Sequence, residues 1–346
     1  MVSTPQTGQN PDHDDRDGSA DRSSSADRSS SAGLNTAAHR LVWRRTTVDG
    51  RLALYGEAGE GLPVVFLHGW GLGQHAYRRP LKRLAQLGCH VWAPALPGFG
   101  GTADLPGDDF SLAGYAAWLD EFLRVVDLDE SAVVVGHSFG GGVAIELAHD
   151  FPDRVRSLVL VNSIGGSAWA HSGSTVRSMA ERPLWDWGLH FPSDVLLIPQ
   201  LARVLPVILQ EAVPNLVRNP RALLRVADLA RRADLTPELE ALKERRLPVV
   251  VLWGDSDRII PKPSFDALCR AIGSEGEVVN GNHSWLLADP DSFGEIMTNV
   301  VGVAQLARSL EHGKAKRRRR LFGLARGAQP RLLPSVARAK PGDEQS

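Results

Sequence analysis

Short apolar runs alternate with stretches of helical periodicity between about residues 40 and 310 of the chain. The runs are rich in Val and Leu and end in Gly or polar residues, as buried strands do. The other stretches repeat apolar residues every three or four positions, as amphipathic helices do. We expect strands within residues 40–58, 63–69, 90–100, 132–136, 154–163, 247–254 and 276–282, and helices at 74–87, 111–127, 139–151 and 289–310.

The alternation of strands and helices predicts a mostly parallel central sheet that is covered by helices on both faces. Its first strand region is expected to be a hairpin that turns at Asp49-Gly50. No strand is predicted from 165 to 246, where apolar helical stretches are separated by prolines. We therefore expect an α/β core from residues 39–164 and 247–312. Residues 165–246 are expected to form a helical cap above the sheet edge at which ligands bind.

Both ends of the chain differ from this core. Residues 1–38 are polar, contain ADRSSS twice in succession, and are expected to be disordered because they have little apolar surface to bury. Residues 313–346 include four consecutive arginines and are expected to form a basic, disordered tail. A solvated tail is one interpretation. A weak contact with acidic lipid headgroups or nucleic acid is the other, because basic and apolar residues are interleaved.

Composition narrows the classes of function. The formal net charge of −1 gives no overall attraction to nucleic acid, so no nucleic-acid partner is expected. Cys89 and Cys269 match no metal or redox pattern and are expected to be ordinary buried thiols. No apolar run is long enough to span a membrane, and the N-terminus lacks an apolar signal-peptide core. A cytoplasmic location is expected, peripheral to a membrane if the basic tail makes contact, and the oligomeric state stays open.

The segment Gly136-His137-Ser138-Phe139-Gly140 joins a predicted strand to a predicted helix. This G-x-S-x-G pattern is typical of a nucleophile elbow, a sharp turn that lifts a serine Oγ above the sheet. An ordinary glycine-rich turn would fit the same letters, so the partners elsewhere in the chain decide between the two interpretations. Ser138 is the candidate nucleophile.

A serine nucleophile needs a base, and the base needs a carboxylate to orient it. Among the eleven histidines, His283 is the best placed, because it follows the last predicted strand and precedes the final helix. Asp255 and Asp257 follow the strand before it, and either could be the acid while the other serves the turn. The order Ser, Asp, His along the chain is the order that accompanies this elbow.

An oxyanion in the transition state needs backbone donors. One candidate is the N–H of Phe139, at the start of the helix that follows the elbow. The other is the N–H of Trp70, in the loop HGWGLG after an earlier strand. His68 in the same loop is expected to brace the loop rather than act as a base.

Together the segments LHGWG, LPGFGGT, GHSFGGG, LWGDSDRIIP and GNHSWLLADP resemble the α/β-hydrolase superfamily over residues 40–310. The resemblance implies the α/β-hydrolase fold and assigns the acid to the fourth residue of a G-x-x-D-x-x-x-P stretch, which is Asp257 here. Asn162 occupies a position that some relatives use for the acid, which strengthens Asp257. A serine at the elbow argues against haloalkane dehalogenase and epoxide hydrolase activity, and HGWG resembles the oxyanion loop of small carboxylesterases.

The sequence therefore predicts a serine hydrolase that cleaves a lipophilic, small-molecule carboxylic ester without a metal or organic cofactor. The predicted cap is rich in Leu, Val and Trp, which favours an apolar acyl pocket. Two alternatives stay open. One is hydrolysis of a carbon–carbon, thioester or peptide bond by the same triad, and the other is a non-catalytic binding protein on the hydrolase fold.

Overall fold

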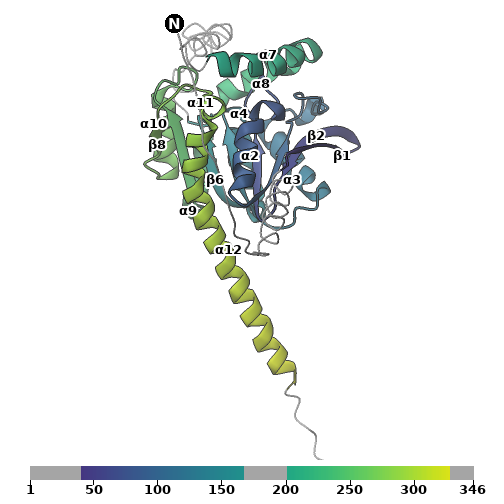
Figure 1. Ribbon diagram of the computed structural model, residues 1–346, viewed down its shortest axis with the longest axis vertical. Helices are drawn as coiled ribbons and strands as arrows, with labels where there is room; N and C mark the ends of the chain where they lie inside the picture. The colour runs from purple at the N-terminus through teal and green to yellow at the C-terminus, as the bar shows by residue number, and fades with distance from the viewer. Residues whose placement is uncertain (1–39, 167–200, 328–346) are drawn as a thin grey trace, which may run out of the picture.

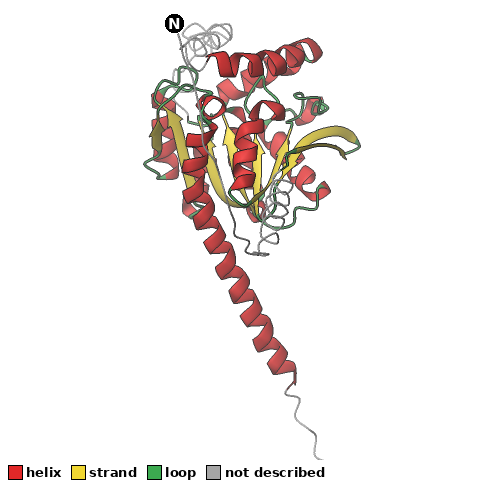
Figure 2. Ribbon diagram, viewed as in Figure 1, coloured by secondary structure: helices red, strands yellow, loops and turns green. Residues whose placement is uncertain are grey.

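The computed structural model describes residues 40–166 and 201–327. Within them, one eight-stranded sheet has the order β1-β2-β4-β3-β5-β6-β7-β8, and it is parallel from β4 to β8. The strands are β1 (Val42–Val48), β2 (Arg51–Ala58), β3 (Leu62–Leu67), β4 (Cys89–Pro94), β5 (Ala132–His137), β6 (Val155–Val161), β7 (Val249–Gly254) and β8 (Glu277–Val279). This is the predicted α/β-hydrolase architecture (Figure 2).

Helices cover both faces of the sheet (Figure 2). The α-helices are α2 (Arg78–Gln86), α3 (Leu112–Val125), α4 (Phe139–Asp150), α7 (Leu201–Arg218), α8 (Pro220–Arg232), α9 (Thr236–Glu244), α10 (Lys262–Ile272), α11 (Trp285–Ala288) and α12 (Pro290–Gly327). Short 3₁₀ helices lie at Gln74–Tyr77, Gly107–Asp109 and Pro152–Arg154.

Alternation along the central strands explains the two layers. Val133 and Val135 of β5 pack with α2, α11 and α12, whereas Ala132 and Val134 pack with α3, α4, α9 and α10. Successive side chains of a strand point to opposite faces, so a strand that is buried on both faces needs an unbroken apolar run. All six residues of β5 are buried.

Local signals that the sequence displays are present in the structure. Asp49 and Gly50 both have positive φ, at 50° and 72°, and join β1 to β2 in a two-residue hairpin. Such φ values match the twist of the flanking strands. Ser111 caps α3, because its hydroxyl accepts a hydrogen bond from the N–H of Gly114 at 3.0 Å. Caps of this kind contribute about 1 kcal/mol to helix stability.

Between β6 and β7, the described residues form α7, α8 and α9, as the absence of strand signals predicts. Asn219 caps α8 by accepting from the N–H of Ala222, and Pro220 fills the first turn, where no N–H is needed. In Figure 1, α7 and α8 lie at one end of the molecule, and α12 extends from the other. The predicted cap segment at 167–200 and the predicted N-terminal tail lie outside the described residues.

The last helix is longer than predicted. The sequence pattern ends it near residue 310 and makes residues 313–346 a disordered tail, but α12 continues to Gly327. The basic stretch consists mainly of Lys, Arg, Leu and Ala, which are strong helix formers, and the first proline after it is Pro330. A segment of polar residues has little apolar surface to pack against the core, but its residues still favour a helical backbone. Among the described residues, no helix is both long enough and apolar enough to cross a membrane.

Candidate active site

The turn between β5 and α4 places Ser138 at the carboxyl edge of the sheet. Ser138 has φ 54° and ψ −117°, a backbone conformation that residues other than glycine rarely adopt. Glycines make this turn possible. A Cβ on Gly136 would lie 2.5 Å from the carbonyl oxygen of Gly140, and one on Gly140 would lie 2.6 Å from that of His68. The strained serine therefore results from close backbone packing on both sides.

Neighbouring strands hold the backbone of Ser138. Its N–H donates to the carbonyl of Val161 at 3.0 Å, and its own carbonyl accepts from the N–H groups of Gly141 and Ile164. Ser138 is buried, with only 7% of its surface exposed. The turn is thus fixed by hydrogen bonds to β6 and to the loop that follows it.

The loops after β7 and β8 bring Asp257 and His283 together. Oδ2 of Asp257 lies 2.8 Å from Nδ1 of His283, and both side chains are buried. The other carboxylate oxygen, Oδ1, accepts from the N–H groups of Ile259 and Ile260 at 2.7 and 2.9 Å. The carboxylate can therefore hold a proton on Nδ1 and leave Nε2 as the acceptor.

Asn162 gives this carboxylate a further partner. Its Nδ2 donates to Oδ2 of Asp257 at 2.5 Å, and its Oδ1 accepts from Nε1 of Trp285 at 3.1 Å. Asn162 stands directly after β6 with a φ of 46°. Asn162, which occupies the alternative acid position, thus donates a hydrogen bond to the candidate acid Asp257.

Asp255, the other candidate, has a different environment. It is exposed, and its Oδ1 accepts from the N–H of Gly281 at 3.1 Å and from the hydroxyl of Ser256. These bonds connect the loop after β7 to the loop that carries His283. The geometry favours Asp255 as a turn residue, as the resemblance implies.

Ser138 and His283 line one small cavity, together with Trp70 and the apolar side chains of Leu72, Ala230 and Ile259. The described residues leave about 20 Å³ of open space in it. The cavity brings together the loop after β3, the elbow, α8 and the loops after β7 and β8. The candidate nucleophile, base and oxyanion loop therefore meet at one place.

The loop after β3 packs closely on the elbow. A Cβ on Gly69 would lie 3.2 Å from the Cβ of Ser138. Phe139 is the first residue of α4, and the first N–H groups of a helix have no partner within the helix. The indole Nε1 of Trp70 donates to the carbonyl of Leu223 in α8 at 2.7 Å. Both predicted oxyanion residues thus lie beside Ser138.

His68 braces this loop. Its Nδ1 lies 2.9 Å from the carbonyl of Gly69, and its Nε2 accepts from the N–H of Leu96 at 2.8 Å. Burial lowers the pKa of His68 to about 4. The ring is therefore neutral near pH 7, and both of its nitrogens are engaged with backbone groups, which leaves no role for it as a base.

His137 links the parts of the site through a buried chain of hydrogen bonds. The N–H of Gly69 donates to Oη of Tyr77 at 3.1 Å, and Tyr77 Oη lies 2.7 Å from Nδ1 of His137. Nε2 of His137 then lies 2.8 Å from the carbonyl of His283. Burial, followed by the charge of His283, lowers the pKa of His137 to about 3. A neutral His137 can bridge the oxyanion loop and the base without opposing a proton on His283.

Helix α7, which lies between β6 and β7 in the sequence, also contacts the loop after β3. Asn215 of α7 is buried; its Nδ2 donates to the carbonyl of Gly71 at 3.1 Å, and its Oδ1 accepts from the N–H of Gly100 at 3.0 Å. Glu211, one turn earlier, lies 3.7 Å from Nδ1 of His75. Helix α7 is thus hydrogen-bonded to the loop that carries Trp70, the second candidate oxyanion donor.

The sequence did not reveal Tyr77, Asn162 as a donor, or Asn215. Each acts through contacts between segments that are distant along the chain, for example 144 residues apart for Asn215 and Gly71. A buried polar residue in an apolar helix was the available signal for Asn215, because such residues need a partner.

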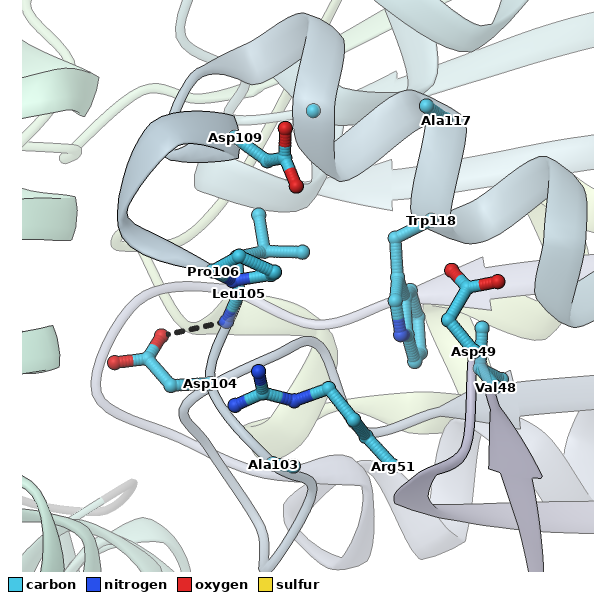
Figure 3. A pocket seen from close by; sticks show the side chains of 11 residues that line it. Val48, Asp49, Arg51, Ala103, Asp104, Leu105, Pro106, Asp109, Ala117 and Trp118 are labelled. Atoms are coloured by element: carbon cyan, nitrogen blue, oxygen red, sulfur yellow. Dashed lines mark hydrogen bonds between the residues drawn. The ribbon is translucent and has the colours of Figure 1, made fainter.

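Larger cavities lie away from this site. A cleft of about 390 Å³ opens beside the β1–β2 hairpin, and its lining includes Asp49, Arg51, Asp104, Asp109 and Trp118 (Figure 3). No serine, histidine or cysteine lines it. This cleft therefore offers no candidate nucleophile or base, and the smaller cavity beside Ser138 is the candidate active site.

A group that could hold a metal lies at the end of α4, where Glu146, His149 and Asp150 have ligand atoms within 4.8 Å of one another. Burial and the charge of Glu238 raise the pKa of Glu146 to about 7. His149 and Asp150 are exposed, and exposed groups of this kind are common at helix ends. This cluster is remote from the cavity beside Ser138 and suggests no cofactor for it.

His68 and His137 should make a destabilising contribution as the pH is lowered from 6.5 to 4. The folded-state pKa values of His68 and His137 lie well below the ordinary value of 6.5. In this range the unfolded chain binds protons that the folded chain refuses, which lowers the unfolding free energy by up to about 1.4 kcal/mol per pH unit for each histidine. Urea denaturation at a series of pH values measures this slope. His137→Gln should make the change of unfolding free energy with pH less steep. The exposed His149→Gln variant is the matched control. An unchanged slope in His137→Gln would contradict the lowered pKa of His137.

Residues 64–296, about two thirds of the chain, match the model of the alpha/beta hydrolase family. The chain belongs to this family. It is a hydrolase, as the sequence predicts.

Particular relatives illustrate the range of this family. The chain is 26% identical over 249 residues to Lipase 1 of Psychrobacter immobilis, covering 68% of this chain and 74% of the lipase. It is 29% identical over 230 residues to a 2-hydroxy-6-oxo-2,4-heptadienoate hydrolase of Pseudomonas putida, covering 61% and 80%. A bromoperoxidase structure from Bacillus anthracis superposes with a TM-score of 0.62 at 18% identity, covering 75% of this chain and all of that one, and shows the shared fold.

Proposed function

We propose that the protein hydrolyses carboxylic esters through an acyl-enzyme on Ser138. The observation that supports this most is the 2.8 Å hydrogen bond between Asp257 and His283 at a cavity that Ser138 also lines. A carboxylate on Nδ1 selects the tautomer in which Nε2 is the proton acceptor, and it stabilises the imidazolium that forms. A serine with a strained backbone at the start of a helix, lining the same cavity, further supports the proposal.

In the proposed reaction, Nε2 of His283 accepts the hydroxyl proton as Oγ of Ser138 attacks the ester carbonyl carbon. The carbonyl π electrons move to oxygen, where the N–H groups of Phe139 and Trp70 donate to the oxyanion. One such donor contributes about 2.7–4 kcal/mol to transition-state stabilisation. The tetrahedral intermediate then collapses, and the alcohol leaves with the proton from His283.

Water completes the cycle by the same groups. His283 removes a proton from water, hydroxide attacks the acyl carbon, and the second tetrahedral intermediate releases the carboxylic acid as Ser138 regains its proton. Asp257 stabilises His283 in its charged form. These steps need only groups of this chain and water.

The described lining of the cavity favours an uncharged, apolar acyl group. Leu72, Ala230 and Ile259 offer no charge to a substrate, and Trp70 adds an aromatic wall. Pockets for small molecules are mostly apolar with few polar anchors. A relative named as a lipase supports a lipophilic ester as substrate.

Hydrolysis of another bond is the second candidate, because a relative is named as a 2-hydroxy-6-oxo-2,4-heptadienoate hydrolase. The same serine, histidine and aspartate could serve carbon–carbon, thioester or peptide cleavage. The sequence alone left a non-catalytic binding protein open, but membership of a hydrolase family and the buried Asp257–His283 pair argue against it.

A substrate panel tests the proposal. We expect kcat/KM for p-nitrophenyl esters to rise from acetate to a medium-chain acyl group, since the lining is apolar. The same preparation is assayed on a vinylogous 1,5-diketone of the ring-cleavage type, an acyl thioester and a peptide anilide. Faster turnover of any of these than of every ester would overturn the proposed ester specificity in favour of that bond. Turnover of none would favour the binding protein.

A further inference from the structure

The two halves of α12 have different surroundings. Phe293, Met297, Val301 and Ala304 are buried and follow one face of the helix at helical spacing, packed on the sheet with α2 and α11. From residue 305 to 311, no described side chain is buried. The helix thus packs on the body in its first half and leaves it in its second (Figure 1).

The base of the projecting part is held firmly. Arg308 donates to the carbonyl of Gly61 at 2.9 Å and to Glu130 at 2.7 Å, and Glu311 pairs with Arg156 at 2.8 Å. These contacts hold the helix against the body at residues 308 and 311, where it begins to project.

An apolar face of this helix is exposed. Val303, Leu306 and Leu310 are 70%, 64% and 59% exposed, although Val, Leu and Ile normally favour the interior. Their spacing of three and four residues puts them on one face, which is turned away from the buried face of the same helix. Leu321 and Leu324 follow Val303 and Leu306 by five turns at about 3.6 residues per turn, so they stand at the same register.

The same part of the helix is strongly basic. No acidic residue occurs between 312 and 327. The basic residues of this stretch are Lys314, Lys316, Arg317, Arg318, Arg319, Arg320 and Arg326. Apolar residues interleaved with clustered Lys and Arg, whose long side chains can reach the headgroup region, are typical of helices that lie at a lipid interface.

We propose that the projecting segment of α12, residues 303–327, binds an anionic lipid surface. The apolar positions would enter the headgroup boundary while the basic residues pair with acidic headgroups. The segment is roughly 35 Å long at about 1.5 Å per residue, long enough to lie along a membrane. It extends from the end opposite to α7 and α8, so the cavity beside Ser138 would face the aqueous phase (Figure 1).

A lipid surface fits this segment better than two other occupants. In a coiled coil with a second copy, the apolar seam would continue through Gly313, Arg317 and Arg320, which interrupt it and bring like charges together. Nucleic acid would satisfy the basic residues but leave the exposed Leu306 and Leu310 without apolar partners.

Vesicle flotation at physiological salt tests the proposal with the full-length protein. We expect it to float with phosphatidylglycerol-containing vesicles and to stay behind with pure phosphatidylcholine. Neutralising three charges by Arg318→Gln, Arg319→Gln and Arg320→Gln should lower the partition coefficient about a hundredfold. Leu306→Ser with Leu310→Ser should lower it as well, because the apolar contact is lost.

A matched variant controls for charge alone. Arg78→Gln, Arg79→Gln and Arg221→Gln remove the same charge from other exposed positions and should leave flotation unchanged. Thermal unfolding checks that every variant is folded. The proposal would be overturned if the full chain bound no vesicles, or if it bound neutral and acidic vesicles equally. Tighter binding to duplex DNA than to the acidic vesicles would also overturn it, as would an equal loss of binding in the control variant. None of these readouts depends on ester hydrolysis.

Discussion

Replacing Ser138 by alanine should reduce the turnover of p-nitrophenyl esters by at least about 10⁴-fold, with KM little changed. Without Oγ, no acyl-enzyme can form, and only the oxyanion donors and substrate binding remain. The loss should appear in kcat, because the hydroxyl acts on the reacting carbon rather than on substrate binding.

The fold should tolerate this substitution. Alanine carries the same Cβ as serine, so the φ of 54° costs both residues about the same. The hydrogen bonds that fix the turn come from the backbone of residue 138. Thermal unfolding should agree with that of the unchanged protein to within about 3 °C. Activity near the original level in a folded Ser138→Ala protein would reject the assignment of the nucleophile.

Asp257→Asn should be nearly as damaging and should lower kcat about 10⁴-fold. The carboxylate oxygen Oδ2 accepts from His283 and from Asn162. An amide at this position keeps one oxygen for the N–H groups of Ile259 and Ile260 and turns an NH₂ group toward two donors. The histidine would then favour the other tautomer, with its proton on Nε2, and could not accept the serine proton.

Asp255→Asn is the matched control for this variant. It removes the same charge two residues away, and its amide oxygen can still accept from the N–H of Gly281. We expect kcat to change less than about tenfold, because Asp255 does not touch His283 in the described contacts. Steady-state kinetics give kcat for both variants. A larger loss of kcat in Asp255→Asn than in Asp257→Asn would show that the acid is Asp255.

The sequence was sufficient to predict where the chemical groups lie along the sheet. Ser138, Asp257 and His283 each follow a strand, and parallel strands share one carboxyl edge, so their meeting could be expected before the structure was seen. Continuous apolar runs were equally informative for β3, β5 and β6, because a strand that is buried on both faces needs apolar side chains at successive positions. The assigned roles in catalysis stay predictions.

Other features depend on contacts that no local pattern contains. Helix α10 was not predicted, although its six buried residues follow a helical period. Pro261 stands at its N-cap and Pro263 lies in its first turn, where a proline is tolerated. The hydrogen bonds of Tyr77 and Asn215 join distant segments and arise only when the fold is complete. The length of α12 was underestimated because polarity was taken as a sign of disorder.

Labelling by a fluorophosphonate tests the central claim most directly. The probe reacts only with a serine whose proton is accepted by a neighbouring base, and intact-mass analysis followed by peptide mapping locates the adduct. We predict one adduct per chain, on Ser138, that is absent in Ser138→Ala and much slower to form in Asp257→Asn than in Asp255→Asn. A folded protein that remains unlabelled, or that carries its adduct on another serine, would contradict the account.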